Sequence, residues 1–318
     1  LQKRMNFNGY HSEKDKFIVI HFQNLGAFYS AKRLFKEGTL IKTIPEITSS
    51  PLRFHSFEAN LDPMLRFIHI ANIQPAGWIH VDKFKKKEKK IANTSIDIET
   101  DWMHVHPSEN EDAGVAPLKQ ASFDIECTAG DGVSFPESSK IEDKVIQIGT
   151  TVYIYGKDNT KPIKHIICLK QTDPIPGAIV ESYETEEEVL LAWTKFIRKL
   201  DPDILTGYNI YGFDFKYLYE RAKLLGIEDK FCMLGRLWGE KSELEEKKLS
   251  SSALGFNQMF ILPMIGRLEI DLFKVIQRDY NFESYKLDAV SAEFIKGKIT
   301  DVKQTKTYTN LVGNTNGL

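Results

Sequence analysis

The chain has 318 residues, with 42 lysines and arginines against 44 aspartates and glutamates, and 42% of its residues are hydrophobic. This is a globular composition with enough apolar material for a core, and the length predicts about two domains. The net charge of −2 excludes a uniformly basic nucleic-acid-binding surface, although it allows a local basic groove. No stretch approaches the ~20 apolar residues of a membrane span, and we expect no signal peptide.

The cysteines indicate which metal chemistry to expect. Cys127, Cys168 and Cys232 lie far apart and form no CxxC or Cys/His pattern, which argues against a disulfide framework and against a zinc site. Any metal should therefore be held by oxygen. The first residue is Leu1 rather than methionine, so we expect a piece of a longer, intracellular protein.

The first third of the chain predicts short strands and turns. We expect strands over 17–22, 65–73 and 76–81, and one helix over 31–38 closed by Gly38. A polar, proline-containing stretch over 101–117 follows. We place the domain boundary there, so that residues 1–117 form a mixed, β-rich N-terminal domain and residues 118–318 a second domain.

The second domain begins with three strands, over 121–126, 145–156 and 162–170. Turn residues separate them at short intervals, which predicts an antiparallel meander. The apolar period then becomes helical over 186–200, where Thr185 and Glu188 have the spacing of a capping box.

A buried-type strand over 203–208 and a helix over 213–225, stopped by Gly226, complete the order βββαβα. A right-handed crossover would lay the later strand parallel to an earlier one. We therefore expect an α/β fold with a mixed central sheet and helices packed on it.

Three acidic residues lie at the end of one of these strands or after a later one. Asp124 and Glu126 are two residues apart on one strand, so their side chains leave the same face, and Asp214 starts the helix after a later strand. Neighbouring strands would bring the three carboxylates together, where divalent cations balance their charge. Two such ions about 3.5–4 Å apart hydrolyse phosphodiesters. Spacing alone favours an ordinary pair of strand-end acids.

The same spacing recurs at Asp97 and Glu99. A polar loop follows this second pair, whereas the long strand, the helix and Asp214 follow the first. We therefore assign Asp97 and Glu99 to a surface strand.

SFDIEC (122–127), VIQIG (145–149), DPDILTGYNIYGFDFKYL (201–218) and the segment over 266–294, in this order, resemble the 3′ to 5′ proofreading exonuclease domain of family B DNA polymerases, and the delta type most closely. The resemblance covers residues 57–294. It implies the RNase-H-like DEDD exonuclease fold, with Asp124 and Glu126 of the Exo I motif and Asp214 of Exo II as catalytic ligands of two Mg²⁺ ions, or of Mn²⁺.

The chain departs from the family at its far end. The Exo III motif of the family, a tyrosine followed three residues later by an aspartate, has no match after Asp214. Tyr285 and Asp288 are one residue too close, and we interpret Asp288 as structural. The palm motifs of the polymerase are absent as well. We expect an exonuclease domain that is cut before Exo III and is a poor nuclease alone.

Four further residues are candidates for contact with substrate: Phe123, Asn209, Phe213 and Lys298. The two aromatic residues equally suit a core role, and one of them could stack on a terminal base. Asp271 ends a strand and could support the ligands from behind. Residues 253–271 predict two strands around a turn, similar to a hairpin of the family that helps move the primer end, although an ordinary hairpin is nearly as plausible.

Six lysines lie within 83–90, a run that could contact a nucleic-acid backbone but more commonly forms a solvated turn. The expected partners are a DNA primer–template and its single-stranded 3′ end, the remaining polymerase domains, and a sliding clamp or accessory subunits, at a nucleus or a viral replication site. The alternative function is a non-catalytic DNA-binding or assembly module of a split polymerase.

Overall fold

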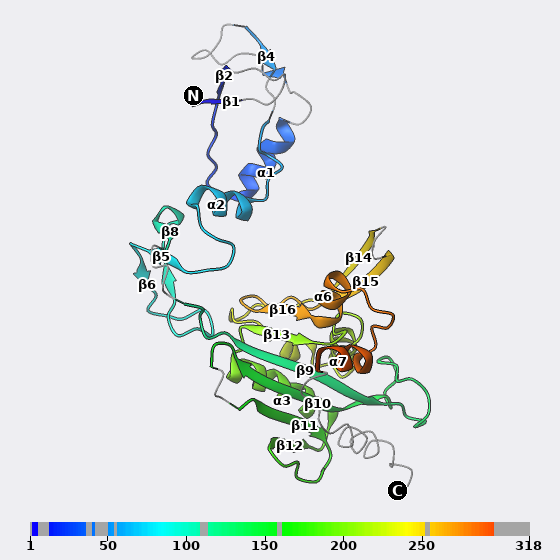
Figure 1. Ribbon diagram of the computed structural model, residues 1–318. Helices are drawn as coiled ribbons and strands as arrows, with labels where there is room; N and C mark the ends of the chain where they lie inside the picture. Colours follow the sequence, from blue (N-terminus) through cyan, green and yellow to red (C-terminus); the bar gives the residue numbers. More distant parts are fainter. Residues whose placement is uncertain are drawn as a thin grey trace. The chain divides into compact units, whose positions relative to one another are not determined.

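The computed structural model describes residues 2–5, 13–35, 40–41, 50–53, 56–108, 114–157, 161–251 and 255–295. The chain divides into two compact units. One comprises Leu1–Asp82 with Asp101–Glu109, and the other comprises Lys83–Thr100 with Asn110–Leu318 (Figure 1). Residues 83–100 therefore belong to the second compact unit. The domain boundary expected at residue 117 remains a prediction. No helix in the described ranges is long and apolar enough to cross a membrane.

The described residues of the first unit form three small antiparallel strand pairs, two α-helices and a short 3₁₀ helix. The pairs are β1 (Gln2–Met5) with β2 (Lys14–Phe17), β3 (Leu40–Ile41) with β4 (Leu52–Arg53), and β5 (Ile79–Val81) with β8 (Val105–Pro107). The helices are α1 (Leu25–Leu34), α2 (Pro63–Ala71) and η1 (Trp102–His104).

The strand predicted over 65–73 is wrong, because α2 occupies this segment. The Asp62 side chain accepts hydrogen bonds from the N–H groups of Met64, at 2.8 Å, and Leu65, while Pro63 occupies the first turn. An N-cap aspartate followed by proline indicates a helix start, but the apolar residues after it were interpreted as a strand. The other predictions here are partly wrong: β2 ends at Phe17, α1 starts six residues before Ala31, and Gly38 lies outside the described residues.

The second unit is built on a six-stranded sheet with the order β12-β11-β10-β9-β13-β16 (Figure 1). The strands are β9 (Lys119–Thr128), β10 (Lys144–Ile154), β11 (Ile163–Leu169), β12 (Ala178–Tyr183), β13 (Ile204–Gly207) and β16 (Leu268–Asp271). The predicted meander is confirmed, since β10 is antiparallel to both β9 and β11. β13 is parallel to β9, so the mixed sheet is confirmed as well.

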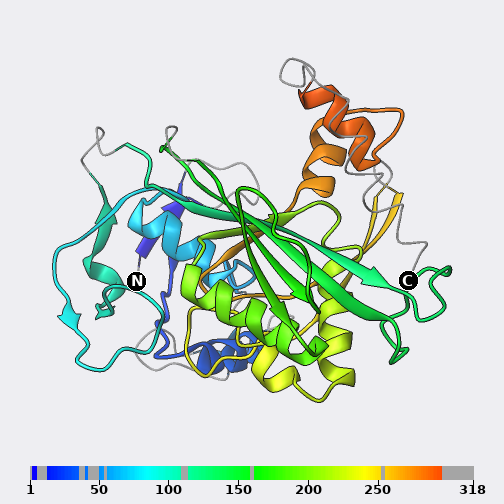
Figure 2. The ribbon, with the colours of Figure 1, turned by 90° about the horizontal axis from the view of Figure 1, so that it is seen from below.

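Helices α3 (Glu186–Leu200) and α4 (Asp214–Leu224) lie on one face of this sheet, with the short α5 (Glu228–Phe231) beside them (Figure 2). The predicted capping box at Thr185 is present. Trp193 of α3, Phe215 of α4 and Phe123 of β9 are fully or almost fully buried and pack ring against ring. This apolar layer fixes the helices to the sheet.

The hairpin predicted over 253–271 lies earlier in the chain than expected. It is formed by β14 (Glu245–Ser251) and β15 (Gly255–Ile261), while β16 leaves it and pairs in parallel with β13. The prediction of two strands within 253–271 is therefore right, but the prediction that they pair with each other is wrong. Helices α6 (Leu272–Asp279) and α7 (Leu287–Ile295) follow.

Residues 83–100 form a small hairpin of β6 (Lys85–Lys86) and β7 (Ile98–Glu99). Asp97 was expected on the surface, yet it is buried. Its carboxylate accepts hydrogen bonds from the N–H groups of Ile91, at 2.7 Å, and Ala92, and from Thr94 Oγ1. Glu99 is exposed, with its Oε2 atom 3.7 Å from Lys87 Nζ. Asp97 therefore organises a turn, which the strand pattern did not reveal.

Candidate active site

Strand β9 divides its residues between the two faces of the sheet. Phe123 and Ile125 are buried, whereas Asp124 and Glu126 are exposed on the opposite face. Gly149 of β10 lies directly across from Asp124, and an added Cβ there would meet no atom within 4 Å. The sequence thus leaves open space beside the Asp124 carboxylate.

Asp214 reaches this strand because β13 is short. The last residue pair between β13 and β9 is Thr206 with Ser122, so β13 leaves the edge of β9 unpaired beyond that point. Asp214 is the first residue of α4 and is 3% exposed. Its Oδ1 atom accepts a hydrogen bond from the N–H of Ile125, the residue between Asp124 and Glu126, at 3.3 Å.

Burial and mutual repulsion shift the pKa values of these three acids upward. Burial, and after it the charge of Asp124, raises the pKa of Asp214 to about 7. Loss of solvent raises the pKa of Asp124, and loss of solvent together with the Asp124 charge raises the pKa of Glu126. Within the described ranges, none of these three carboxylates forms an ion pair with a lysine or an arginine. The cluster therefore has a negative charge that its protein surroundings do not balance.

Asp271 holds the loop between β13 and α4 in place. It ends β16, opposite Gly207, and is 2% exposed. Its carboxylate accepts hydrogen bonds from the N–H groups of Asn209, at 2.8 Å, and Tyr211, at 3.1 Å, and it also caps α6 through Phe273. With its lone pairs committed to backbone donors, Asp271 positions the loop that leads to Asp214. The sequence indicated such a supporting role only by the position of Asp271 at a strand end.

Asn209 and Phe213 lie on this loop. Asn209 has a φ of 65° and its carbonyl accepts hydrogen bonds from Gly212 and Phe213, which makes a tight turn. Phe213 is half-buried and packs edge-on against Phe135, with ring centroids 5.6 Å apart. Phe123, in contrast, is 2% exposed and packs on Trp193, so it belongs to the core and has no free face for a substrate.

A groove of about 780 Å³ runs along α4 next to these residues. Its lining includes the rings of Phe135 and Phe213, two lysines and two glutamates, and Lys216 Nζ lies 3.9 Å from Glu220 Oε1. The ring of Phe135 is 74% exposed. Exposed aromatic faces suit the bases of an unpaired nucleic-acid strand. Phe135 was not among the predicted residues, because it lies in a loop without a motif that the residues alone make visible.

The residues present fit a divalent cation. Within the described ranges, no three His, Cys, Asp or Glu side chains are grouped so as to hold a metal ion by themselves. Mg²⁺ does not require such a cage, because it keeps several waters and is usually held by one or two carboxylates together with substrate phosphates. Asp124 and Asp214 offer only oxygen atoms and have an unbalanced charge. This donor set suits Mg²⁺ or Mn²⁺.

The remaining predicted residues lie elsewhere. Asp97 and Glu99 belong to the β6–β7 hairpin, which pairs with no strand of the six-stranded sheet. Asp288 is exposed near the start of α7. Lys298 lies outside the described residues.

Comparisons with known proteins agree with this geometry. The family described as DNA polymerase family B, exonuclease domain, matches residues 54–290. The chain is 33% identical over 311 residues to the DNA polymerase delta catalytic subunit of Mesocricetus auratus, which covers 96% of this chain and 27% of that protein. The same subunit of Arabidopsis thaliana is 38% identical over 253 residues, covering 78% and 23%.

A viral relative is also similar. The DNA polymerase of Pyramimonas orientalis virus is 28% identical over an alignment of 421 residues, which covers 91% of this chain and 34% of that protein. The chain thus spans about a quarter to a third of the length of these curated relatives.

Proposed function

The chain belongs to the exonuclease-domain family of the family B DNA polymerases, and we propose that its second unit hydrolyses the 3′-terminal phosphodiester of a DNA strand. The observation that carries this proposal is the position of Asp214 against β9, between Asp124 and Glu126. Coupled carboxylates on an open sheet face suit phosphodiester hydrolysis better than they suit a binding module.

The side chains of the site fall into three roles in this proposal. Asp124, Glu126 and Asp214 would hold one or two Mg²⁺ ions, which supply a nucleophile at neutral pH and stabilise the leaving oxygen. Phe213 and Phe135 would stack on the unpaired 3′-terminal bases. Asn209 shapes the loop, and Asp271 acts through that loop as a positioning residue.

The reaction consumes one water molecule. The oxygen of water forms a bond to the terminal phosphorus, and the bond from that phosphorus to the preceding 3′ oxygen breaks. The products are a nucleoside 5′-monophosphate and a strand one residue shorter that ends in a 3′ hydroxyl. Removal of a mismatched primer end in this way is proofreading, which would occur in a nucleus or at a viral replication site beside the polymerase domains of a longer protein.

The test is digestion of a 5′-labelled oligonucleotide in Mg²⁺ by an enzyme that continues through the polymerase domains. The double variant Asp124→Ala, Glu126→Ala should lose 3′ to 5′ degradation and keep nucleotide addition, because addition uses carboxylates of another domain. A double variant that still trims a mismatched end refutes the assignment.

The alternative, a non-catalytic DNA-binding or assembly module, has one observation in its favour: the described residues contain no group of three ligands that could hold a metal ion by themselves. The same experiment separates the two functions. If the unmodified enzyme binds the oligonucleotide but does not shorten it in Mg²⁺ or Mn²⁺, the alternative is correct.

A further inference from the structure

The lysine run of residues 83–90 is attached to the exonuclease unit in a defined way. The β6–β7 hairpin is closed by a hydrogen bond from Lys87 N to Asp97 O at 2.9 Å and by one from Thr100 Oγ1 to Lys83 O. In the loop that joins the two strands, Ala92 forms an isolated bridge with Leu237. The run is therefore part of an ordered element of the second unit.

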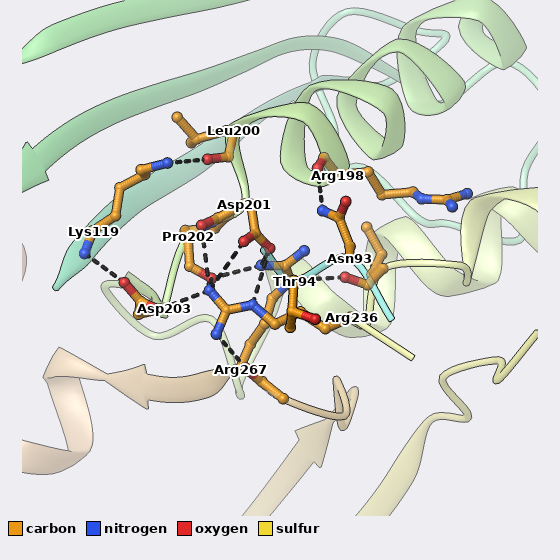
Figure 3. Close-up of polar contacts among 12 residues, drawn as sticks. Asn93, Thr94, Lys119, Arg198, Leu200, Asp201, Pro202, Asp203, Arg236 and Arg267 are labelled. Atoms are coloured by element: carbon orange, nitrogen blue, oxygen red, sulfur yellow. Dashed lines mark hydrogen bonds and ion pairs between the residues drawn. The ribbon is translucent and has the colours of Figure 1, made fainter. Parts of the chain in front are cut away.

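Asn93 is the anchor of this element. Its N–H donates to the carbonyl of Arg236 at 2.7 Å, and its Nδ2 donates to the carbonyl of Arg198, near the end of α3, at 2.8 Å. Arg236 is itself held by ion pairs to Asp201 at 2.9 Å and Asp203 at 2.7 Å (Figure 3). The ion pairs that hold Arg236 at the start of β13 and the end of α3 thus also fix the loop between β6 and β7, in which Asn93 lies.

This anchor lies at the edge of the sheet away from the candidate active site. Asp203 precedes β13, and it also bonds the backbone at Lys119, where β9 starts, and at Leu268, where β16 starts. Asp124, Asp214 and Asp271 gather toward the carboxyl ends of the same parallel strands. Four residues of a strand separate the two edges by about 13 Å.

The lysines of the run are mostly uncompensated. Lys87 pairs with Glu99, and Lys90 Nζ donates to the carbonyl of Thr94 at 2.7 Å. The other four, Lys83, Lys85, Lys86 and Lys89, are exposed and form no ion pair within the described ranges. Glu88 is the single acidic residue in 83–90, and the whole chain is close to neutral, so the positive charge is local.

Exposed aromatic rings accompany this charge. Phe84 lies between Lys83 and Lys85 and is 54% exposed. Trp238 is 48% exposed, and its main-chain N–H donates to the carbonyl of Ile91, the residue after the run. Duplex DNA offers phosphates but no free base faces, whereas an unpaired strand offers both.

We propose that Lys83, Lys85, Lys86 and Lys89, with Phe84, form a second binding site for single-stranded DNA on the exonuclease unit, separate from the carboxylate cluster. The proposal rests on the proposed function, because it assigns this surface to the strand on which the unit acts. The hairpin would hold a distant part of the strand and contribute to its affinity. It takes no part in the chemical step.

The test measures binding to a fluorescein-labelled oligothymidylate by anisotropy in EDTA, with the 318-residue chain. The variant with all four lysines replaced by alanine should bind about tenfold or more weakly, and its salt slope should fall by about 2 to 3, since each lost phosphate contact removes about 0.7 for a single strand. Phe84→Ala should weaken binding about tenfold. Replacement of the four lysines by arginine should restore affinity.

A matched control keeps the change of net charge constant. Lys161, Lys164, Lys195 and Lys230 are exposed and lie outside the hairpin, and their replacement by alanine should change affinity by less than about threefold. Equal losses in the two quadruple variants would overturn the proposal. So would a loss of affinity for duplex DNA or for polyglutamate without a loss for the single strand, because these outcomes assign the patch to other partners.

The outcome can be separated from that of the proposed function, because binding is measured without divalent cations. If the four-alanine variant binds normally while the double variant of Asp124 and Glu126 stops digestion, the second site is refuted and the exonuclease stands. If binding falls as expected while the unmodified enzyme never digests DNA, the exonuclease is refuted and the second site stands.

Discussion

The main-chain N–H of Ile125 donates a hydrogen bond to the Oδ1 atom of Asp214, 3.3 Å away, and so joins two motifs that are 89 residues apart in the sequence. The bond exists because β13 stops pairing with β9 at Thr206 and leaves the N–H of Ile125 without a strand partner. The same bond holds a buried carboxylate beside Asp124. The Asp214 carboxylate is thus buried beside another acid, an arrangement that lowers the stability of the folded protein when Asp214 is ionised.

Asp214→Asn should therefore keep or increase stability. The pKa of Asp214 is raised to about 7, so at higher pH the folded protein contains a buried charge, while an asparagine Oδ1 can still accept from Ile125. Without divalent cations, we expect a gain of about 1 kcal/mol in the free energy of unfolding near pH 8, together with loss of nuclease activity. Urea unfolding checks the first part, and a clear loss of stability would contradict this account of the charge.

Glu269 should give stability a pH dependence. Burial raises its pKa from 4.5 to about 7, so the folded state binds this proton more tightly than the unfolded state. Stability from this group is present below the unfolded pKa and is lost as the pH rises through about 7. Glu269→Gln should flatten the fall in the urea midpoint over that interval. The exposed Glu240→Gln should leave the fall unchanged, and equal slopes in all three proteins would disprove this attribution.

The buried pair of Glu186 and Arg221 should be essential to the helical layer. Their side chains are 3% and 0% exposed, and Arg221 Nε donates to Glu186 Oε1 at 2.8 Å. Glu186→Gln leaves a buried guanidinium without its counter-charge, which should cost about 3–5 kcal/mol. In the exposed pair of Lys170 and Glu184, Glu184→Gln should cost less than about 1 kcal/mol by urea unfolding. Similar losses in both pairs would show that burial does not matter here.

Gly207 should tolerate no side chain. A Cβ at this position would lie 2.5 Å from the carbonyl oxygen of Phe123 and from Ile210 Cγ2, so Gly207→Ala must push β13 away from β9. We expect a loss of about 1–3 kcal/mol, measured by thermal unfolding. Gly149→Ala is the matched control, because its Cβ would meet nothing within 4 Å. An unchanged melting temperature in Gly207→Ala would contradict the close approach of these strands.

The sequence was most informative where local patterns and long-range packing agree. Thr185, Glu188 and the apolar face of α3 predicted that helix correctly, and the strand predicted over 121–126 lies within β9. In the first unit, the cap at Asp62 outweighed the β-like run after it. Strand pairing was harder to predict. The sequence around β15 and β16 gives no indication that β16 joins the central sheet, because pairing depends on distant residues.

The candidate site shows the same division. The two-residue spacing placed Asp124 and Glu126 on one face, but Asp97 and Glu99 share that spacing, and in the sequence only the segments that follow them distinguish the two pairs. The commitment of Asp271 to three backbone donors, and the exposed ring of Phe135, depend on loops whose conformation no periodicity encodes.

The most direct test of the central claim, that Asp124, Glu126 and Asp214 together bind a divalent cation, is titration of the chain with Mn²⁺ followed by electron paramagnetic resonance. We predict that Asp124→Asn, Glu126→Gln and Asp214→Asn each weaken Mn²⁺ binding by at least about tenfold, because each removes a charged ligand. Glu99→Gln and Asp288→Asn, which change equivalent acids outside the cluster, should bind like the unmodified chain. Unchanged Mn²⁺ affinity in the first three variants would contradict the account.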